Sequence, residues 1–125
     1  MDLRISELLE MQRELQDKHP EWGGTPPERA QDQLLWAIGE IGEVIDLFKK
    51  RGIDRIMREP QTRRHFVEEL ADVEMYLMDI MLCTGVTAEE YSAAHREKHL
   101  RNMGRNFRDE NEHLFDRGRD QSEPD

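Results

Sequence analysis

The segment from residue 60 to residue 83 constrains the fold most, because it is apolar on nearly every side of a helix. Pro60 suits a first helical turn and Gly85 suits a helix end. The apolar residues between them are Phe66, Val67, Leu70, Val73, Met75, Tyr76, Leu77, Met78, Ile80, Met81, Leu82 and Cys83. Neighbours must cover such a helix, so we expect it at the centre of a bundle or an oligomer.

The rest of the chain also carries helical signals. A dense set of prolines and glycines in residues 19–27 predicts a loop. Thr87 and Glu90 fit a capping box, and Gly52 follows three basic residues as a helix end commonly does. We expect four helices, at residues 3–17, from 25 or 26 to 51, 60–83 and 87–105, with a short turn at 53–60. The fold class predicted is all-α.

Two of these helices carry pairs of acids among apolar residues. At 100° per residue, the helix ending at residue 51 has one wide apolar stripe, made of Leu34, Ala37, Ile38, Ile41, Val44, Ile45 and Phe48. A second line on this helix is made of Trp36, Glu40, Glu43 and Leu47. On the next long helix, Glu69 and Asp72 share a face with Tyr76. Acids in such surroundings cost free energy unless a cation or a partner compensates them.

Four carboxylates on two facing helices would supply hard oxygen ligands, which suit Mg²⁺ or Mn²⁺. Mg²⁺ commonly completes its coordination with phosphate oxygens, so a polyphosphate is the expected ligand of an open acidic site. A single pair of acids at this spacing is frequent on ordinary solvated helices and carries almost no signal. Because two such pairs lie in apolar surroundings, a metal site and a purely structural role for the acids are about equally probable.

Composition and charge narrow the function classes. The chain has 125 residues, 37% of them charged, and a formal net charge of −10. We therefore expect one domain, residues 1–107, with a charged, mobile tail at 108–125. The negative charge argues against binding to nucleic acid or to an anionic membrane. No leader or long apolar run is visible, so the expectation is a cytoplasmic protein without a membrane contact. The single cysteine, Cys83, is expected to be buried.

The acidic pairs also carry a family resemblance. The sequence reads GEIGEV at residues 39–44 and EELADV at 68–73, with Tyr76 four residues after the aspartate. This order resembles the MazG-type all-α nucleoside triphosphate pyrophosphohydrolases, whose pattern is ExxE, a spacer, and ExxD. The resemblance covers about residues 34–105, and the paired motif is moderately specific.

The resemblance implies a four-helix MazG-like bundle that assembles as a homodimer or homotetramer. It implies Mg²⁺, with Mn²⁺ as an alternative, held by four residues that are also catalytic: Glu40, Glu43, Glu69 and Asp72. The reaction implied is cleavage of a ribo- or deoxyribonucleoside triphosphate to the monophosphate and pyrophosphate, in a role such as clearing unwanted nucleotides from the pool. Glu43 or Glu69 is the candidate base, and Glu68 or Asp79 the candidate support for the ligands.

Further residues are substrate-binding candidates. By resemblance, Lys98, Asn102 and Arg105 meet phosphate or sugar, and Tyr76 sits near the nucleotide. Trp36 and Trp22 are candidates for stacking on the base, with simple packing as the competing interpretation of each. The preferred base is left undetermined.

Two rival interpretations remain. A di-iron bundle uses Glu-x-x-His pairs on core helices, but the only such pair is Glu110 to His113, in the predicted tail. His65 precedes Glu69 in the reverse order and is expected near a helix start or on the phosphate side. The other rival, from a different class, is a non-catalytic helical oligomer or regulatory protein that keeps the acids as a structural cation site.

Overall fold

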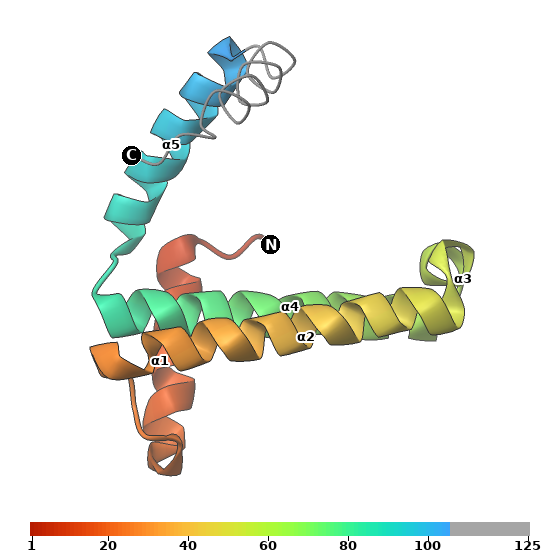
Figure 1. Ribbon diagram of the computed structural model, residues 1–125, viewed down its shortest axis with the longest axis horizontal. Coiled ribbons are helices and arrows are strands. Elements are labelled where there is room, and N and C mark those ends of the chain that lie inside the picture. The colour runs from red at the N-terminus through yellow and green to blue at the C-terminus, as the bar shows by residue number, and fades with distance from the viewer. Residues whose placement is uncertain (106–125) are drawn as a thin grey trace, which may run out of the picture. The chain divides into compact units, whose positions relative to one another are not determined.

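A computed structural model of the chain describes residues 1–105, and all the regular secondary structure in this part is helical, as predicted (Figure 1). Its α-helices are α1 (Ile5–Lys18), α2 (Ala30–Arg51), α3 (Ile53–Arg58), α4 (Pro60–Thr84) and α5 (Ala88–Gly104). Short 3₁₀ helices span Pro20–Trp22 and Pro27–Arg29. The predicted boundary at residue 107, the tail at 108–125 and Glu110 to His113 lie outside the described residues.

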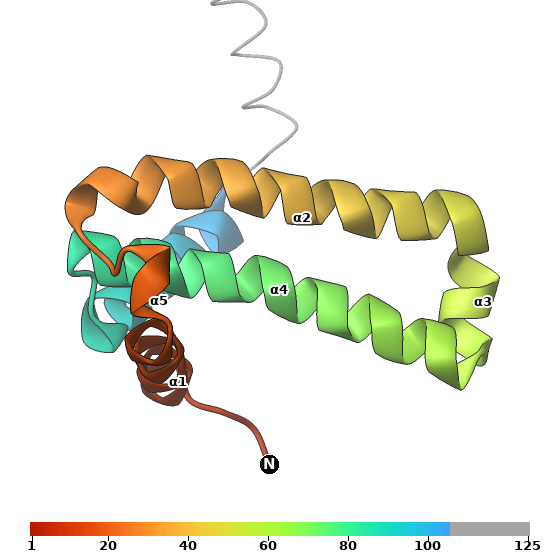
Figure 2. The same cartoon turned by 90° about the horizontal axis from the view of Figure 1, so that it is seen from below.

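The chain divides into two compact units, residues 1–88 and the residues from Glu89 on. In the first unit α2 and α4 run antiparallel and side by side, and α3 joins them at one end (Figures 1 and 2). Near the other end α1 packs across α4. The helix α5 begins at Ala88, directly after Thr87, where the capping-box pattern predicts a helix start, and from Glu89 on it belongs to the second unit.

Aromatic pairs bridge the two long helices. Phe48 meets Phe66 edge to face, with ring centroids 5.6 Å apart. Toward the other end of α2, the rings of Trp36 and Tyr76 are tilted, with centroids 6.3 Å apart. These pairs favour one antiparallel register, because a shift along either helix would separate both of them.

The connection at α3 is short and firmly anchored. Gly52 ends α2 at a φ of 80°, a conformation that glycine adopts without steric cost, and its N–H donates to the Phe48 carbonyl at 2.9 Å. Ile56, 1% exposed, is the most deeply buried apolar side chain of residues 1–105. The sequence predicts only a turn here, because a helix of six residues is too short to show a period.

The start of α2 differs from the prediction. We expected the helix to begin at residue 25 or 26, but Pro26 is extended and residues 27–29 form a 3₁₀ turn before α2 starts at Ala30. The physical reason is that a residue followed by proline is driven out of the helical conformation. Arg29 then ties this segment down, donating through Nη1 to the Trp22 and Gly24 carbonyls.

Only part of the wide apolar stripe predicted on α2 packs against the rest of the unit: Ala37 is buried and Phe48 meets Phe66 of α4. Ile38, Ile41 and Ile45 are 63%, 45% and 49% exposed, whereas α2 buries Gln33, Ala37 and Leu47. On α4, Met78, Met81 and Cys83 are buried, which confirms the prediction for the cysteine. That helix nevertheless leaves apolar side chains exposed at Val67, Leu70 and Leu77. The unit thus carries apolar surface that its own helices do not cover.

Along residues 1–105, every helix is too short or too polar to span a lipid bilayer.

Truncating the α3 anchor should destabilise the fold. Ile56→Ala leaves a cavity under a fully buried side chain, so we expect the free energy of unfolding to fall by roughly 2–4 kcal/mol. Urea denaturation measures it. Ile53→Ala, at a position 55% exposed on the same helix, is the matched control and should have little effect. Equal losses in the two variants would contradict an anchoring role for Ile56.

Candidate metal centre

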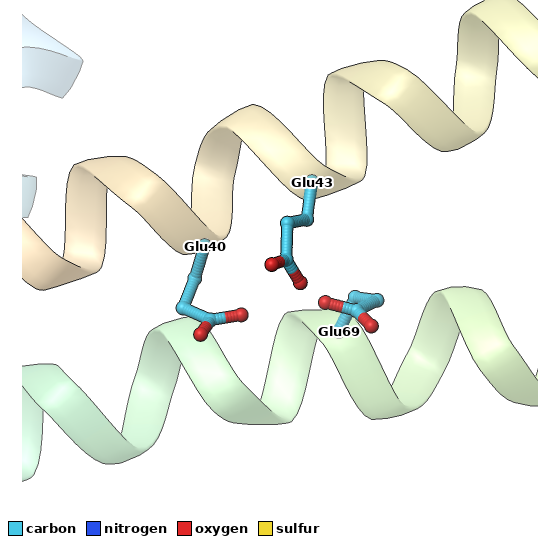
Figure 3. Close-up of side chains that lie close together, drawn as sticks. All are labelled: Glu40, Glu43 and Glu69. Carbon is cyan, nitrogen blue, oxygen red and sulfur yellow. The ribbon is translucent and has the colours of Figure 1, made fainter.

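Three glutamates from two helices converge between α2 and α4. Glu40 and Glu43 point from α2 toward α4, and Glu69 reaches back from α4 to meet them (Figure 3). One carboxylate oxygen of each lies within 4.8 Å of the others. The three-residue spacing puts Glu40 and Glu43 on one side of α2, and the register of the pair brings Glu69 opposite. We call these residues the carboxylate cluster.

Burial makes the cluster electrostatically unfavourable without a counter-charge. Glu69 is 8% exposed, and in the described part of the chain neither its Oε2 nor that of Glu40 has a hydrogen-bond partner. Burial raises the pKa of Glu40, and repulsion from Glu43, Asp72 and Glu69 adds to it. Burial likewise raises the pKa of Glu69. Hydrogen bonding to Glu43 and charge repulsion from Glu43 raise this pKa further.

The cluster fits a small divalent cation. Carboxylate oxygens are the ligands that Mg²⁺ and Mn²⁺ prefer, and two buried oxygens of the cluster have no hydrogen-bond partner among residues 1–105. Two ligands of one Mg²⁺, each at about 2.1 Å, lie no more than about 4.2 Å apart. The cluster spans up to 4.8 Å, so small side-chain adjustments would bring its oxygens within reach of one ion. One basic group, His65, lies beside the cluster, with its Nε2 3.5 Å from Glu69 Oε1.

Asp72, the fourth predicted ligand, is not in this group of three. It is exposed, one turn beyond Glu69 on α4, and it contributes to raising the pKa of both Glu40 and Glu69. The structure therefore brings together three of the four predicted carboxylates and places the fourth beside them.

A cavity of about 630 Å³ opens beside the cluster, and Glu40 and Asp72 form part of its wall. The three aromatic residues predicted to meet a substrate, Trp22, Trp36 and Tyr76, all line it. We call it the aromatic cavity. Its volume lies within the range of small-molecule sites.

Each tryptophan also makes a packing contact. The Trp22 ring stacks on His19, with centroids 4.3 Å apart and planes 14° from parallel. The Arg29 guanidinium lies over the Trp36 ring, 5.5 Å from its centroid. Trp22 and Trp36 nonetheless keep 42% and 45% of their surface exposed, so part of each ring is accessible at the cavity.

The cavity also contains a buried polar network that the sequence analysis missed. Gln12 and Gln16 of α1 each donate through Nε2 to Asp79 Oδ1 at 2.9 Å. Burial raises the pKa of Asp79, while these two hydrogen bonds and the charge of Arg29 act against the rise. Asp79, one of the two candidates for supporting the metal ligands, accepts the hydrogen bonds that hold α1 against α4. The signal available in the sequence was two glutamines four residues apart among the apolar positions of an amphipathic helix.

The remaining predicted site residues lie at the end of the chain's described part. Lys98 and Asn102 are on α5, and Arg105, directly after it, donates through Nη1 to Asn102 Oδ1 at 3.1 Å. They belong to the second compact unit, and their contact with phosphate or sugar stays a prediction.

No protein-family model, curated protein or solved structure matches the chain. The resemblance to MazG-type enzymes therefore depends on the paired acidic motif alone.

The raised pKa of Glu69 predicts a pH-dependent stability. Below the ordinary value of 4.5 the carboxyl is neutral in both states, and as pH rises through the raised folded pKa the metal-free protein loses stability. Glu69→Gln is neutral at every pH. In EDTA at about pH 8 we expect this variant to melt roughly 2–5 °C above wild type, with the gap closing toward about pH 4.5.

Glu68→Gln, at the neighbouring exposed position, is the control and should follow the wild-type melting curve at every pH. A Glu69→Gln variant that melts below wild type at the higher pH would contradict an electrostatic conflict in the cluster.

Proposed function

We propose that this chain is a Mg²⁺-dependent nucleoside triphosphate pyrophosphohydrolase of the MazG type, with Mn²⁺ as an alternative metal. It would hydrolyse a ribo- or deoxyribonucleoside triphosphate to the monophosphate and pyrophosphate. The observation that carries the proposal is the convergence of Glu40, Glu43 and Glu69 beside a cavity with aromatic walls. Buried acids without partners favour a cation, and the cavity offers space for the organic part of a ligand.

The order of side chains along the two helices supports a direction for the substrate. On one side of the carboxylate cluster lies the aromatic cavity, with Trp36 and Tyr76. On the other side, a second cavity of about 570 Å³ is lined by Arg51, Arg55 and His65, among others. A nucleotide lying along the pair would have its base among the aromatic rings, its phosphates over the acids and its far phosphate near these basic groups.

The chemistry proposed assigns different tasks to the three glutamates. When bound, Mg²⁺ neutralises phosphate charge and makes a coordinated water more acidic. Glu40 and Glu69, each with a buried oxygen lacking a partner in the described residues, would hold the metal. Glu43 is exposed and is the better placed to take a proton from water. The water oxygen forms a new bond to phosphorus as the bridging P–O bond breaks, and pyrophosphate leaves with its oxygen.

We also propose that the chain self-associates as a homodimer or homotetramer through the exposed apolar stripe of α2. Helical geometry puts Ile38 and Ile45 on the side of the pair that faces away from the acids, together with Leu70 of α4. Gly42 supports this, since it lies beside Ile38 and Ile45 around the helix and a Cβ there would meet nothing within 4 Å in the described chain. Glycine inside a helix costs stability, and close approach by another helix would give it a use.

A non-catalytic oligomer with a structural cation site is the second candidate, and the exposed stripe favours assembly in either case. The two differ in turnover. Release of monophosphate and pyrophosphate from a panel of nucleoside triphosphates supports the enzyme, whereas tight Mg²⁺ binding with no turnover of any nucleotide supports the structural site.

Removing cluster carboxylates should abolish hydrolysis. We expect Glu40→Gln and Glu69→Gln to lower kcat/KM by at least about 100-fold, with helical content retained, because each removes charge that would hold the metal. Pyrophosphate release in saturating Mg²⁺ measures it. Asp72→Asn tests the fourth position of the family pattern, for which the same loss is expected. Glu14→Gln, at an exposed position of α1, is the control and should keep the wild-type rate. Wild-type rates in the cluster variants would refute the assignment.

Charging the apolar stripe should dissociate the assembly. We expect the wild-type chain to elute at two or four times 14.9 kDa, and the double variant Ile38→Lys/Ile45→Lys at the mass of one chain. Light scattering after size exclusion measures both. Ile53→Lys adds a similar charge on α3 and should leave the mass unchanged. A monomeric wild-type chain would exclude the proposed assembly.

A further inference from the structure

The aromatic cavity has buried hydrogen-bond acceptors that nothing in the described chain satisfies. Gln16 is 6% exposed and Gln33 is 2% exposed, and the Oε1 atom of each lacks a hydrogen-bond partner within residues 1–105. Both residues line the cavity, as does Asp79. A buried amide oxygen without a partner is costly, and a ligand that donates to it recovers that cost.

The network fixes which atom of Gln16 is available. Its Nε2 donates to Asp79 Oδ1, and turning the amide over would put its oxygen against that carboxyl oxygen. Gln12 donates to the same oxygen and holds the carboxyl in place. The Gln16 oxygen is therefore turned away from Asp79 and is left as an acceptor.

The nearby cation is already engaged. The Arg29 guanidinium donates through Nη1 to the carbonyls of Trp22 and Gly24, and it lies over the Trp36 ring. The cavity is consequently rich in acceptors, between aromatic rings that can contact the face of a base. A ligand matched to it is planar and carries several N–H donors on one edge.

From this geometry we infer that the cavity prefers a nucleobase that carries an exocyclic amino group. A base that has a carbonyl oxygen at that position, or that lacks the amino group, should bind less tightly. This inference rests on the proposed function, because it takes from it that the ligand is a nucleotide. An amino group offers two donors to Gln16, Gln33 and Asp79. The carbonyl oxygen of uracil or hypoxanthine would instead face these acceptors, leaving them unpaired.

Binding of nucleosides to the full chain in EDTA tests this without phosphate, metal or turnover. Both tryptophans of the chain line the cavity, so their fluorescence reports occupancy, and calorimetry checks the values. Guanosine and adenosine are compared with inosine, and cytidine with uridine. We expect at least one amino-bearing nucleoside to bind roughly 10- to 100-fold more tightly than its counterpart, and the preferred pair identifies the base.

Two variants connect the preference to the network. Gln33→Met and Gln16→Met each remove an acceptor at similar side-chain volume. Each should bring the ratio of the two dissociation constants in the preferred pair close to one. Gln31→Met, at an exposed position of α2, is the matched control and should keep the wild-type ratio of dissociation constants. Melting curves establish which variants are folded. If the Gln33 variant is unstable, binding to the Gln16 variant tests the base preference.

The outcomes separate this inference from the reaction. If amino-bearing nucleosides bind more tightly but no triphosphate is hydrolysed, the base preference stands and the proposed activity falls. If triphosphates are hydrolysed with equal kcat/KM for both members of every pair, the preference falls and the activity stands. Equal binding within every pair, or no binding of any nucleoside at millimolar concentration, also overturns the preference.

Discussion

The antiparallel packing of α2 on α4 is the contact on which the rest of the first unit depends. Its register sets Trp36 beside Tyr76 and Phe48 beside Phe66, and the same register brings Glu43 to Glu69. Because the two helices turn with the same period, one fixed pairing determines all the others along their length. The aromatic contacts thereby position acids that would otherwise repel each other.

That packing stabilises a local conflict. The middle of the α2 and α4 pair contains carboxylates with raised pKa values, where a core would ordinarily contain apolar side chains. Stabilising contacts lie on either side of this point. Ile56 is buried at the α3 end, and the hydrogen bonds from Gln12 and Gln16 to Asp79 close the other end. A conflict of this kind, held in place by well-packed neighbours, is typical of binding sites.

The sequence predicted the helices well because breakers and periodicity are local signals. Gly52 and Gly85 end α2 and α4 as expected, and Glu40 and Glu43 face Glu69 across the two helices. The covered side of α2 was harder to predict, since periodicity shows which side is apolar and not which side another helix covers. Ile38 and Ile45 illustrate this difference. The glutamine network also escaped prediction, because Gln12 and Gln16 gain their meaning only from Asp79, more than sixty residues away.

Two parts of the chain form the wall of the aromatic cavity, and hydrogen bonds to Asp79 connect one part to the other. Its acidic edge belongs to the α2 and α4 pair, whereas α1 and the segment at residues 19–29 supply the glutamines, Trp22 and Arg29. Asp79 is the hydrogen-bonded link between α1 and this pair. Substitutions in the first 29 residues can therefore reshape the wall while the acids keep their positions. Under the proposed function, ligand preference could diversify by changes in this N-terminal part alone, with the hydrolytic chemistry inherited unchanged.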